Sequence, residues 1–271
     1  MQLSARRQLD AVQRRVTSPS RRLALLAPSN TFIPNIFNDV RRDSDGHRAL
    51  FAEMQRFRGQ VYLQDRAIKH NDLIEGRHIV EADDDSWHLL VHDENGKIAG
   101  CIRYQVHDTR SAFLRLSVFS SAIAACPQWG PALKQAVHSE ITMARNLNLS
   151  FVEVGGWALA EHIRGTSEAL RLALAAYSLG QLMGGAVGMS TATRRHCSSS
   201  ILRRMGGESL KYDGTPIPAY YDPQYECEME ILRFQSWTPN PRYMLWVEEI
   251  RQSLQHIPVI GNTAWALAAA G

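Results

Sequence analysis

The sequence predicts an α/β (α+β) fold in which helices flank a mixed central β-sheet, with an extension at each end of the chain. One reason is a hairpin, because two apolar runs, residues 87–91 and 98–106, are joined by Asp-Glu-Asn-Gly. Asn-Gly between apolar runs favours a hairpin because both residues tolerate positive φ. A second reason is that the strand expected at residues 151–159 passes through a compact turn into the apolar helix 168–181 and then into the strand 186–193. Antiparallel strands followed by a β-α-β unit give a sheet of mixed direction.

The other elements follow from apolar periodicity and from turn residues. A helix ends at Gly206-Gly207, since glycine is the usual residue beyond a helix C-terminus. Residues 227–231 alternate between apolar residues and glutamates, as expected of a half-buried strand. The remaining expected elements are helices at residues 47–62, 131–145 and 198–205 and a hairpin of residues 218–221 and 227–234.

Three segments are expected along the chain: a basic extension at residues 1–40, a domain at 41–236 and an aromatic, helical extension at 237–271. The first extension carries paired arginines and one acidic residue before Asp39. A mobile basic tail, a short amphipathic helix and an organellar transit peptide all fit this pattern. Residues 32–37 are apolar and predict an ordered strap over the domain.

Composition excludes several classes of protein. The formal net charge of +3 in 271 residues is too small to indicate nucleic-acid binding. No apolar run approaches the roughly 20 residues needed for a transmembrane segment. The four cysteines lack C-x-x-C spacing and the ten histidines form no ligand set, so we expect no metal site, no disulfides and a cytoplasmic location.

The turn before the helix 168–181 is a candidate phosphate site. Gly165 is flanked by Thr166 and Ser167 at the helix start, where backbone N–H groups have no intrahelical acceptor. These donors and the helix dipole favour a phosphate. The alternative is a glycine required only for packing.

This order of elements resembles that of the GNAT acyltransferase superfamily, in which the turn holds the phosphates of coenzyme A or of a carrier-protein arm. The superfamily pattern has three defined positions: first Arg or Gln, then Gly, and last Gly or Ala. This chain has His162, Gly165 and Ser167 at these positions, so one of the three matches. The resemblance implies an acyl-thioester cosubstrate, acyl-CoA or acyl-ACP, and no permanently bound cofactor. The residues implied to bind it are Gly155, Trp157, Ala158, Arg164, Gly165, Thr166 and Ser167.

Residues 50–234 are similar to one branch, the acyl-homoserine-lactone synthases and N-acyl amino acid synthases. The similarity rests on four features: Arg58 followed by Tyr62, the Glu81-Ala82-Asp83 cluster, Gly100-Cys101-Ile102-Arg103, and Glu153 in a core strand. It implies that Arg58, Glu81, Asp83 and Asp85 bind substrate. Ser86 stands where the lactone synthases have a further aspartate, so use of S-adenosylmethionine is not supported.

Two residues are expected to carry the chemistry. Glu153 is the expected general base, with a pKa raised by burial. Arg103 is expected to hold Glu153 or the carboxylate of the acceptor; the alternative is a fixed Glu153–Arg103 ion pair without catalysis. Gly155-Gly156 is expected to open the sheet for a pantetheine arm, or else to form a bulge without ligand. Leu202 stands where acetyltransferases carry a tyrosine acid.

A basic cluster and an aromatic segment bear on the acyl donor. The basic cluster consists of Arg194, Arg195, Arg203 and Arg204. It predicts either a docking surface for an acidic acyl carrier protein or an ordinary solvated helix face. Residues 237–246 are expected to line an acyl-chain pocket or to cover the sheet as a packing element.

Together these features predict an N-acyltransferase that moves a long-chain acyl group to an amino acid or a similar small amine, with a membrane-associated product. The alternatives are a short-chain acetyl-CoA-dependent N-acetyltransferase and a non-catalytic module that binds a ligand or a carrier protein.

Overall fold

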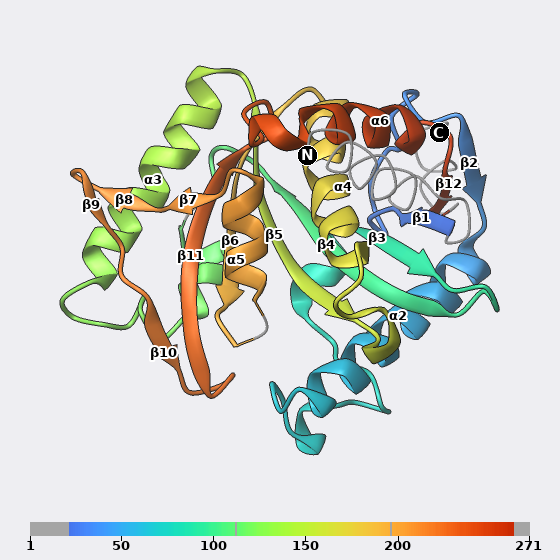
Figure 1. Cartoon of the computed structure of the whole chain (residues 1–271), viewed down its shortest axis with the longest axis horizontal. Helices are drawn as coiled ribbons and strands as arrows, with labels where there is room; N and C mark the ends of the chain where they lie inside the picture. Colours follow the sequence, from blue (N-terminus) through green and yellow to red (C-terminus); the bar gives the residue numbers. More distant parts are fainter. Residues whose placement is uncertain (1–21, 112, 196, 263–271) are drawn as a thin grey trace, which may run out of the picture.

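The computed structural model describes residues 22–111, 113–195 and 197–262. They form one large mixed sheet with helices on both faces, and a separate two-stranded sheet made by residues 211–212 and 215–216 (Figure 1). The strand order is β10-β11-β6-β5-β4-β3-β1-β12-β2, and β7 pairs with β11. The strands are β1 (Arg22–Leu26), β2 (Asp39–Arg42), β3 (Ser86–His92), β4 (Ile98–His107), β5 (Ser150–Leu159), β6 (Ala186–Thr193), β7 (Glu208–Ser209), β8 (Lys211–Tyr212), β9 (Thr215–Pro216), β10 (Tyr220–Asp222), β11 (Cys227–Gln235) and β12 (Pro258–Gly261). The helices are α2 (Ser44–Gln64), α3 (Gly130–Asn146), α4 (Glu168–Leu182), α5 (Ser198–Met205) and α6 (Met244–Leu254).

The predicted fold class is confirmed. Strands β3 and β4 form the Asn-Gly hairpin, β5 and β6 are parallel neighbours joined through α4, and β10 and β11 form the last hairpin. Helix α2 begins at an Asp43 side chain that accepts a hydrogen bond from the Gly46 N–H, 2.9 Å away.

Each face of the sheet has its own apolar core. Helices α4 and α6 pack on one face, where Leu172 and Trp246 join residues of β1, β3, β4 and β5. On the opposite face, α2 packs over Leu90 and Cys101, and α3 packs over Phe151. We call this second side the α2–α3 face. Polar residues of β4 lie between the two apolar clusters of this face. They separate α2 from α3 at the position of the candidate site.

Both chain ends contribute to the sheet. Strand β12 pairs in parallel with β1 and with β2, so residues expected within terminal extensions continue the sheet beyond β3. These strands span only four or five residues, which is too short for apolar alternation to be recognised in the sequence. Residues 1–21, including most of the paired arginines, lie outside the described part of the chain.

The two flanking segments expected to order over the domain do so. Ile33 and Phe37 are buried in the α4-side core, whereas Phe32 is exposed. In the C-terminal segment, Tyr243 and Trp246 are buried in the same core, and the Ser178 hydroxyl donates to the Val247 carbonyl, 2.8 Å away. This segment therefore packs against α4, which favours a covering element over the lining of an acyl-chain pocket.

None of the helices in the described ranges is long and apolar enough to cross a membrane.

Candidate active site

Strands β5 and β6 run side by side only over their first halves. They pair at four positions, Ser150–Glu153 against Ala186–Met189, and form no further register pairs. The second half of β5 therefore diverges from β6, and the turn that leads into α4 lies at the open end because it follows β5 directly (Figure 1). We use the name β5–β6 cleft for this unpaired stretch, in which β5 beyond Glu153 has no register partner on β6. An extended arm with alternating donors and acceptors can pair with such a strand edge.

A β-bulge causes the divergence. Cys101 pairs with Ala158 and Arg103 with Gly155, so two residues of β5 oppose one residue of β4. Gly156, at φ +61, lies in the bulge, where a left-handed backbone conformation favours glycine. The bulge bends β5 away from β6.

Gly156 of the double glycine also makes room for two arginines. A Cβ on Gly156 would lie 3.1 Å from the Arg103 Cβ and 3.4 Å from the Arg58 Nη1. A Cβ on Gly155 would lie 3.6 Å from the Arg103 Nη2. The contact at Gly155 is an ordinary van der Waals distance, so it is the missing side chain of Gly156 that leaves room for the two arginines on the α2–α3 face.

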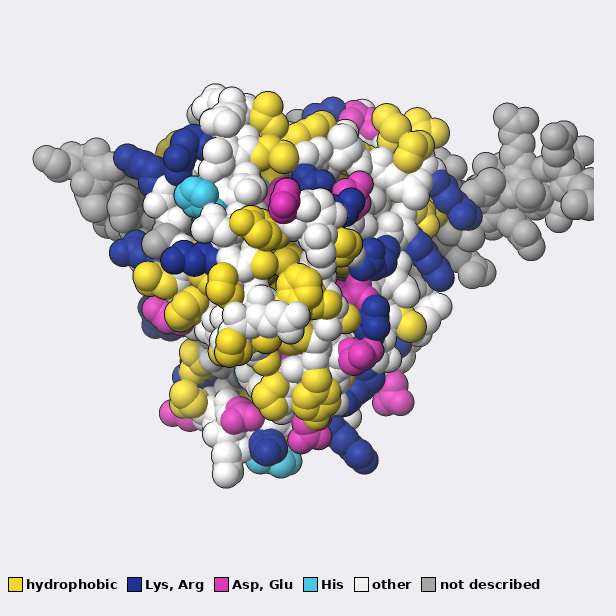
Figure 2. All heavy atoms as spheres, turned by 90° about the vertical axis from the view of Figure 1, so that its left-hand side faces the viewer, with side chains coloured by type: hydrophobic (Ala, Val, Ile, Leu, Met, Phe, Trp, Pro, Cys, Tyr) yellow, Lys and Arg dark blue, Asp and Glu magenta, His cyan; other side chains and the backbone are white. Residues whose placement is uncertain are grey.

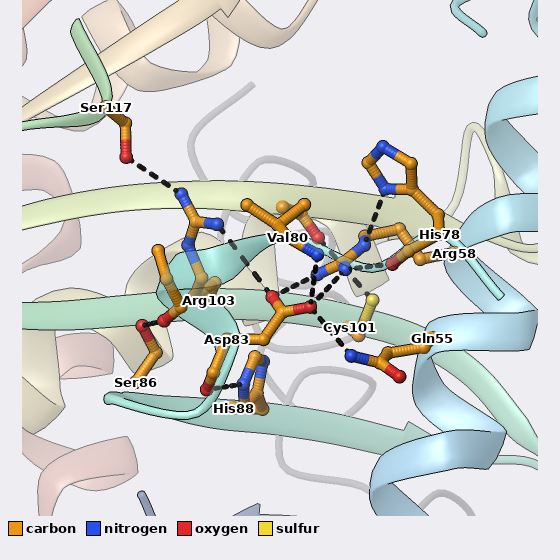
Figure 3. A network of polar contacts seen from close by, with 12 residues as sticks. Gln55, Arg58, His78, Val80, Asp83, Ser86, His88, Cys101, Arg103 and Ser117 are labelled. Carbon is orange, nitrogen blue, oxygen red and sulfur yellow. Dashed lines mark hydrogen bonds and ion pairs between the residues drawn. The ribbon is translucent and has the colours of Figure 1, made fainter. Parts of the chain in front are cut away.

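Arg58 and Asp83 form the centre of a buried polar network (Figure 3). Arg58 donates to both Asp83 oxygens, at 2.8 and 2.6 Å, and to the His78 carbonyl at 2.6 Å. Asp83 also accepts from the Gln55 amide at 3.0 Å. Burial alone would raise the pKa of Asp83, but the hydrogen bonds and charge of Arg58 outweigh it and lower that pKa to about 2. The pair is ionised and joins α2 to the loop before β3.

Two histidines in this network are neutral near pH 7. Burial lowers the pKa of His88 to about 4, and burial with the nearby Arg58 charge lowers that of His78 to about 4. The His88 Nε2 lies 3.0 Å from the Asp83 carbonyl, to which it donates. The His88 Nδ1 is therefore an acceptor, and it has no partner among the described residues.

Arg103 shares the Asp83 carboxylate at longer range. Its Nη1 lies 3.8 Å from Asp83 Oδ1, and its Nη2 donates to the Ser117 hydroxyl at 3.3 Å (Figure 3). Its Nε is buried and has no hydrogen-bond partner in the described chain. Because both histidines are neutral, the network holds two guanidinium charges against one carboxylate.

Glu153 does not have the expected environment. It accepts hydrogen bonds from His107 Nε2 at 2.9 Å and from the N–H groups of Ser117 at 2.8 Å and Val118 at 3.1 Å. Burial would raise its pKa, but these donors and the charge interaction with His107 outweigh burial and lower it. The expectation of a raised pKa was wrong, and so was the alternative of a Glu153–Arg103 ion pair, since Glu153 lies opposite Gln105. Glu153 instead anchors the short helix η4 (Ser117–Ser120) over the site.

The acidic cluster before β3 is brought into the site only in part. Asp83 is buried, whereas Glu81 and Asp85 are exposed and lie outside the network of Arg58. Ser86 is buried, and its hydroxyl donates to the Ala82 carbonyl.

The polar groups of the candidate phosphate turn are largely used in hydrogen bonds and ion pairs within the protein. Arg164 forms a two-point ion pair with Asp65 at 2.6 and 2.8 Å and donates to the Leu159 carbonyl. The N–H groups of Arg164 and Thr166 donate to carbonyls of the same turn, and the Glu168 N–H donates to the Thr166 hydroxyl at 3.2 Å. Gly165 has φ +72, and a Cβ there would meet nothing within 4 Å. The turn has the predicted conformation, with fewer free donors than expected.

Two of the three β5 residues expected to bind the thioester, Trp157 and Ala158, point to opposite faces. Ala158 is buried in the α2 cluster, and Trp157 packs against the α4-side core. The indole Nε1 of Trp157 is buried without a partner among the described residues.

The predicted carrier-protein surface carries acids as well. Arg194 pairs with Glu228 at 3.0 Å and with Glu230, and Arg203 pairs with Glu230 at 2.6 Å. Arg195 donates to the carbonyls of Asp65 and Glu226. Arg204 is exposed. The face formed by α3 and the last hairpin likewise shows positive and negative side chains interspersed with apolar ones (Figure 2).

Sequence reasoning missed three residues of the site. Gln105 and His107 follow Arg103 at alternate positions of β4, so all three lie on the α2–α3 face, and all three are buried. Ser117 reaches the same place from η4. Polar residues at i, i+2 and i+4 of an otherwise apolar strand were the available signal for the first two. Nothing in the local sequence marks Ser117.

A hollow of about 720 Å³ lies elsewhere, along the outer face of α3 between His138 and Leu147, and it is open to solvent. It includes none of the residues above. Among the described residues, no group of three or more His, Cys, Asp or Glu is placed to hold a metal ion.

No protein-family model matches the sequence, and no curated protein matches it. The fold is similar to that of BjaI, a CoA-dependent acyl-homoserine lactone synthase, in two solved structures. In the structure with SAM and isopentyl-CoA the TM-score is 0.54 at 13% identity, covering 92% of this chain and 98% of BjaI. In the structure with MTA the TM-score is 0.53 at 12% identity, with the same coverage. FeeM, an N-acyl amino acid synthase from uncultured soil microbes, has a TM-score of 0.45 at 12% identity, covering 80% of this chain and 92% of FeeM, and this looser match does not distinguish the two kinds of synthase.

Proposed function

We propose that this chain, which has the GNAT-type fold of an acyl-homoserine lactone synthase, is an acyltransferase. It would move an acyl group from a phosphopantetheine thioester to the amine of a small molecule. The observation that carries the proposal is the β5–β6 cleft, which opens at a bulge beside the buried arginine network.

The cleft gives the thioester arm a strand edge to pair with. β5 beyond Glu153 has β4 on one side and no strand pairing on the side of β6. The acyl carbonyl would then lie near the bulge, over Arg103 on the α2–α3 face. The amine nitrogen attacks the carbonyl carbon, the tetrahedral intermediate expels the thiolate, and the proton lost by the amine ends on that thiolate, which leaves as the thiol.

We assign Glu153 to positioning rather than to proton abstraction. A carboxylate whose pKa is lowered is a weak base near neutral pH. His107, whose Nε2 donates to Glu153, is held by this contact in one orientation.

The donor is coenzyme A or an acyl carrier protein, since both present the same pantetheine arm. Charge reversal at exposed Arg204 should reduce kcat/KM for an acyl carrier protein and leave that for acyl-CoA unchanged if a carrier docks on α5. Arg48→Glu, a charge reversal at another exposed arginine near the start of α2, is the control. Equal effects of the two substitutions would favour coenzyme A.

The test of the function uses the purified chain with acyl-CoA and acyl carrier protein of C2 to C16 chain length and a pool of amino acids and amines. Thiol release coupled to a new N-acyl product in the mass spectrum would support the proposal and name the chain length. Thioester binding without turnover for any donor would contradict it. That result would favour a non-catalytic binding module. The supporting observation is that polar groups of the phosphate turn are already bonded within the protein.

A further inference from the structure

We infer that Asp65 is an internal competitor for the phosphate group of the thioester donor. Its carboxylate is bonded to Arg164 and its backbone carbonyl to Arg195, at the open end of the β5–β6 cleft. A donor phosphate binds the same two guanidinium groups and displaces Asp65. The inference rests on the proposed function only in that the donor carries a pantetheine phosphate. We call these three residues and their contacts the Asp65 bridge.

The Asp65 bridge joins the chain segments that leave the two strands of the cleft. β5 ends at Leu159 and β6 ends at Thr193, so Arg164 and Arg195 come shortly after the C-terminal ends of neighbouring parallel strands. Ligands of α/β proteins commonly bind at this end of a sheet, where neighbouring strands diverge. Asp65 is the C-cap residue of α2 and reaches the same place from that helix. It therefore lies across the end by which a donor arm enters the cleft.

The contact between Asp65 and Arg164 is one that a phosphate can reproduce. The Arg164 Nη1 and Nη2 donate to the two Asp65 carboxylate oxygens at 2.6 and 2.8 Å. The planar fork of an arginine fits two oxygens of a carboxylate or two oxygens of a phosphate. The Arg164 side chain is 33% exposed, so its guanidinium is accessible from solvent. A phosphate that arrives at the turn competes with Asp65 for the same donors.

The second arginine is held by weaker acceptors. The Arg195 Nη1 donates to the Asp65 carbonyl at 3.4 Å, and its Nη2 donates to the Glu226 carbonyl. Both acceptors are neutral, and Arg195 is exposed. An anion adds a charge attraction that a carbonyl lacks. Within the bridge, two guanidinium groups face one carboxylate, and this excess of positive charge favours a further anion.

The Asp65 bridge therefore makes phosphate a condition for tight binding. A donor with a phosphate exchanges one anionic partner of Arg164 for another, whereas a thioester without a phosphate gains nothing by breaking the bridge. Removal of the Asp65 carboxylate removes the competitor, so it should strengthen the binding of phosphate-bearing ligands. A purely structural ion pair predicts the opposite, because its loss would loosen the turn that receives the phosphate.

The test is a calorimetric titration of the full chain with coenzyme A, with 4′-phosphopantetheine and with pantetheine, which lacks a phosphate. Asp65→Asn should bind the first two roughly 3- to 10-fold more tightly than the unchanged chain and should bind pantetheine equally well, because only phosphate competes with the carboxylate. Unchanged or weaker binding of coenzyme A by the folded variant would overturn the inference. Equal tightening for pantetheine would also overturn it, as would the failure of both phosphate compounds to bind either chain.

Further variants separate competition from a change of structure. Asp65→Glu retains a carboxylate and should bind coenzyme A as the unchanged chain does, whereas Asp65→Ser should tighten binding as Asp65→Asn does. Arg164→Met should weaken coenzyme A binding, and Asp65→Asn added to it should no longer tighten binding, since both changes remove one shared contact. Asp45→Asn, at an exposed acid in the first turn of α2, is the control and should change nothing. Thermal unfolding verifies that each variant is folded.

The outcomes also separate this inference from the proposed function. Tighter binding of coenzyme A by Asp65→Asn with no acyl transfer from any donor would support the Asp65 bridge and refute the acyltransferase. Acyl transfer by both chains with equal affinities for coenzyme A would support the acyltransferase and refute the bridge as a competitor.

Discussion

Arg58 and Arg103 are both buried and both face Asp83, yet they differ in how fully they are bonded. Arg58 has four hydrogen bonds, two to Asp83 and two to His78, between 2.6 and 3.2 Å. Arg103 has one at 3.3 Å and a distant ion pair. The same side chain thus holds the fold together at one position and retains binding capacity at the other. The difference depends on which guanidinium lies closer to the one carboxylate.

The largest effect is expected from removing that carboxylate. Asp83→Asn leaves two buried guanidinium groups without an anion, so we expect the free energy of unfolding to fall by about 3–5 kcal/mol. Urea unfolding measures this loss. Asp85→Asn, at an exposed neighbour, should change stability by less than about 0.5 kcal/mol. Equal losses would show that Asp83 does not organise the network.

Acid should weaken the same network through His88. Its folded pKa of about 4 lies below the unfolded value near 6.5, so the unfolded chain binds the proton first. The resulting loss begins as pH falls below about 6.5 and reaches roughly 3 kcal/mol by pH 4. His88→Gln keeps a donor for the Asp83 carbonyl and should flatten the dependence of stability on pH between 6.5 and 4. An unchanged pH profile in this variant would contradict the assignment.

The comparison of the two arginines can be tested by giving each the same substitution. Arg58→Met should lower the free energy of unfolding by about 2–4 kcal/mol, because it removes the close partner of the buried Asp83 carboxylate. Arg103→Met should cost less than about 1 kcal/mol, because a distant and incompletely bonded charge is replaced by a side chain of similar length. Acyl-transfer activity should fall in Arg103→Met nonetheless. If the two stability losses are equal, Arg103 is as structural as Arg58.

The effect on stability expected at Glu153 is smaller than those at Asp83 and Arg58. Glu153→Gln places an amide N–H₂ among three hydrogen-bond donors. We therefore expect the free energy of unfolding to fall by about 1–2 kcal/mol. Because the folded pKa of Glu153 is lowered, its contribution is present above its unfolded value near 4.5 and is lost as pH falls through the folded pKa. Turnover should drop while the apparent pKa of the pH–rate profile is retained. Loss of the pKa on the acidic limb, below which a general base is protonated, would instead make Glu153 the proton acceptor.

The sequence predicted the sheet-forming elements well, because they depend on local patterns. The Asn-Gly hairpin, the β-α-β unit and the final alternating strand each carry their signal within a few residues. The resemblance named Arg58 and Asp83 only as substrate-binding residues, and their ion pair with each other was not predicted. Short strands β1, β2 and β12 were not anticipated, since each is defined by its neighbours in the sheet.

By itself, the sequence determined the fold class, the order of its elements and the set of polar residues from which a site could be built. The tertiary structure decided which of them meet. Glu153 became an anchored acceptor because η4, 33 to 36 residues away in the chain, turns its N–H groups onto it. Arg103 was left with an Nε that has no partner among the described residues, because α2 brings Arg58 closer to Asp83. The pKa and the free hydrogen-bonding capacity of a side chain depend on groups that only folding brings within a few ångströms of it.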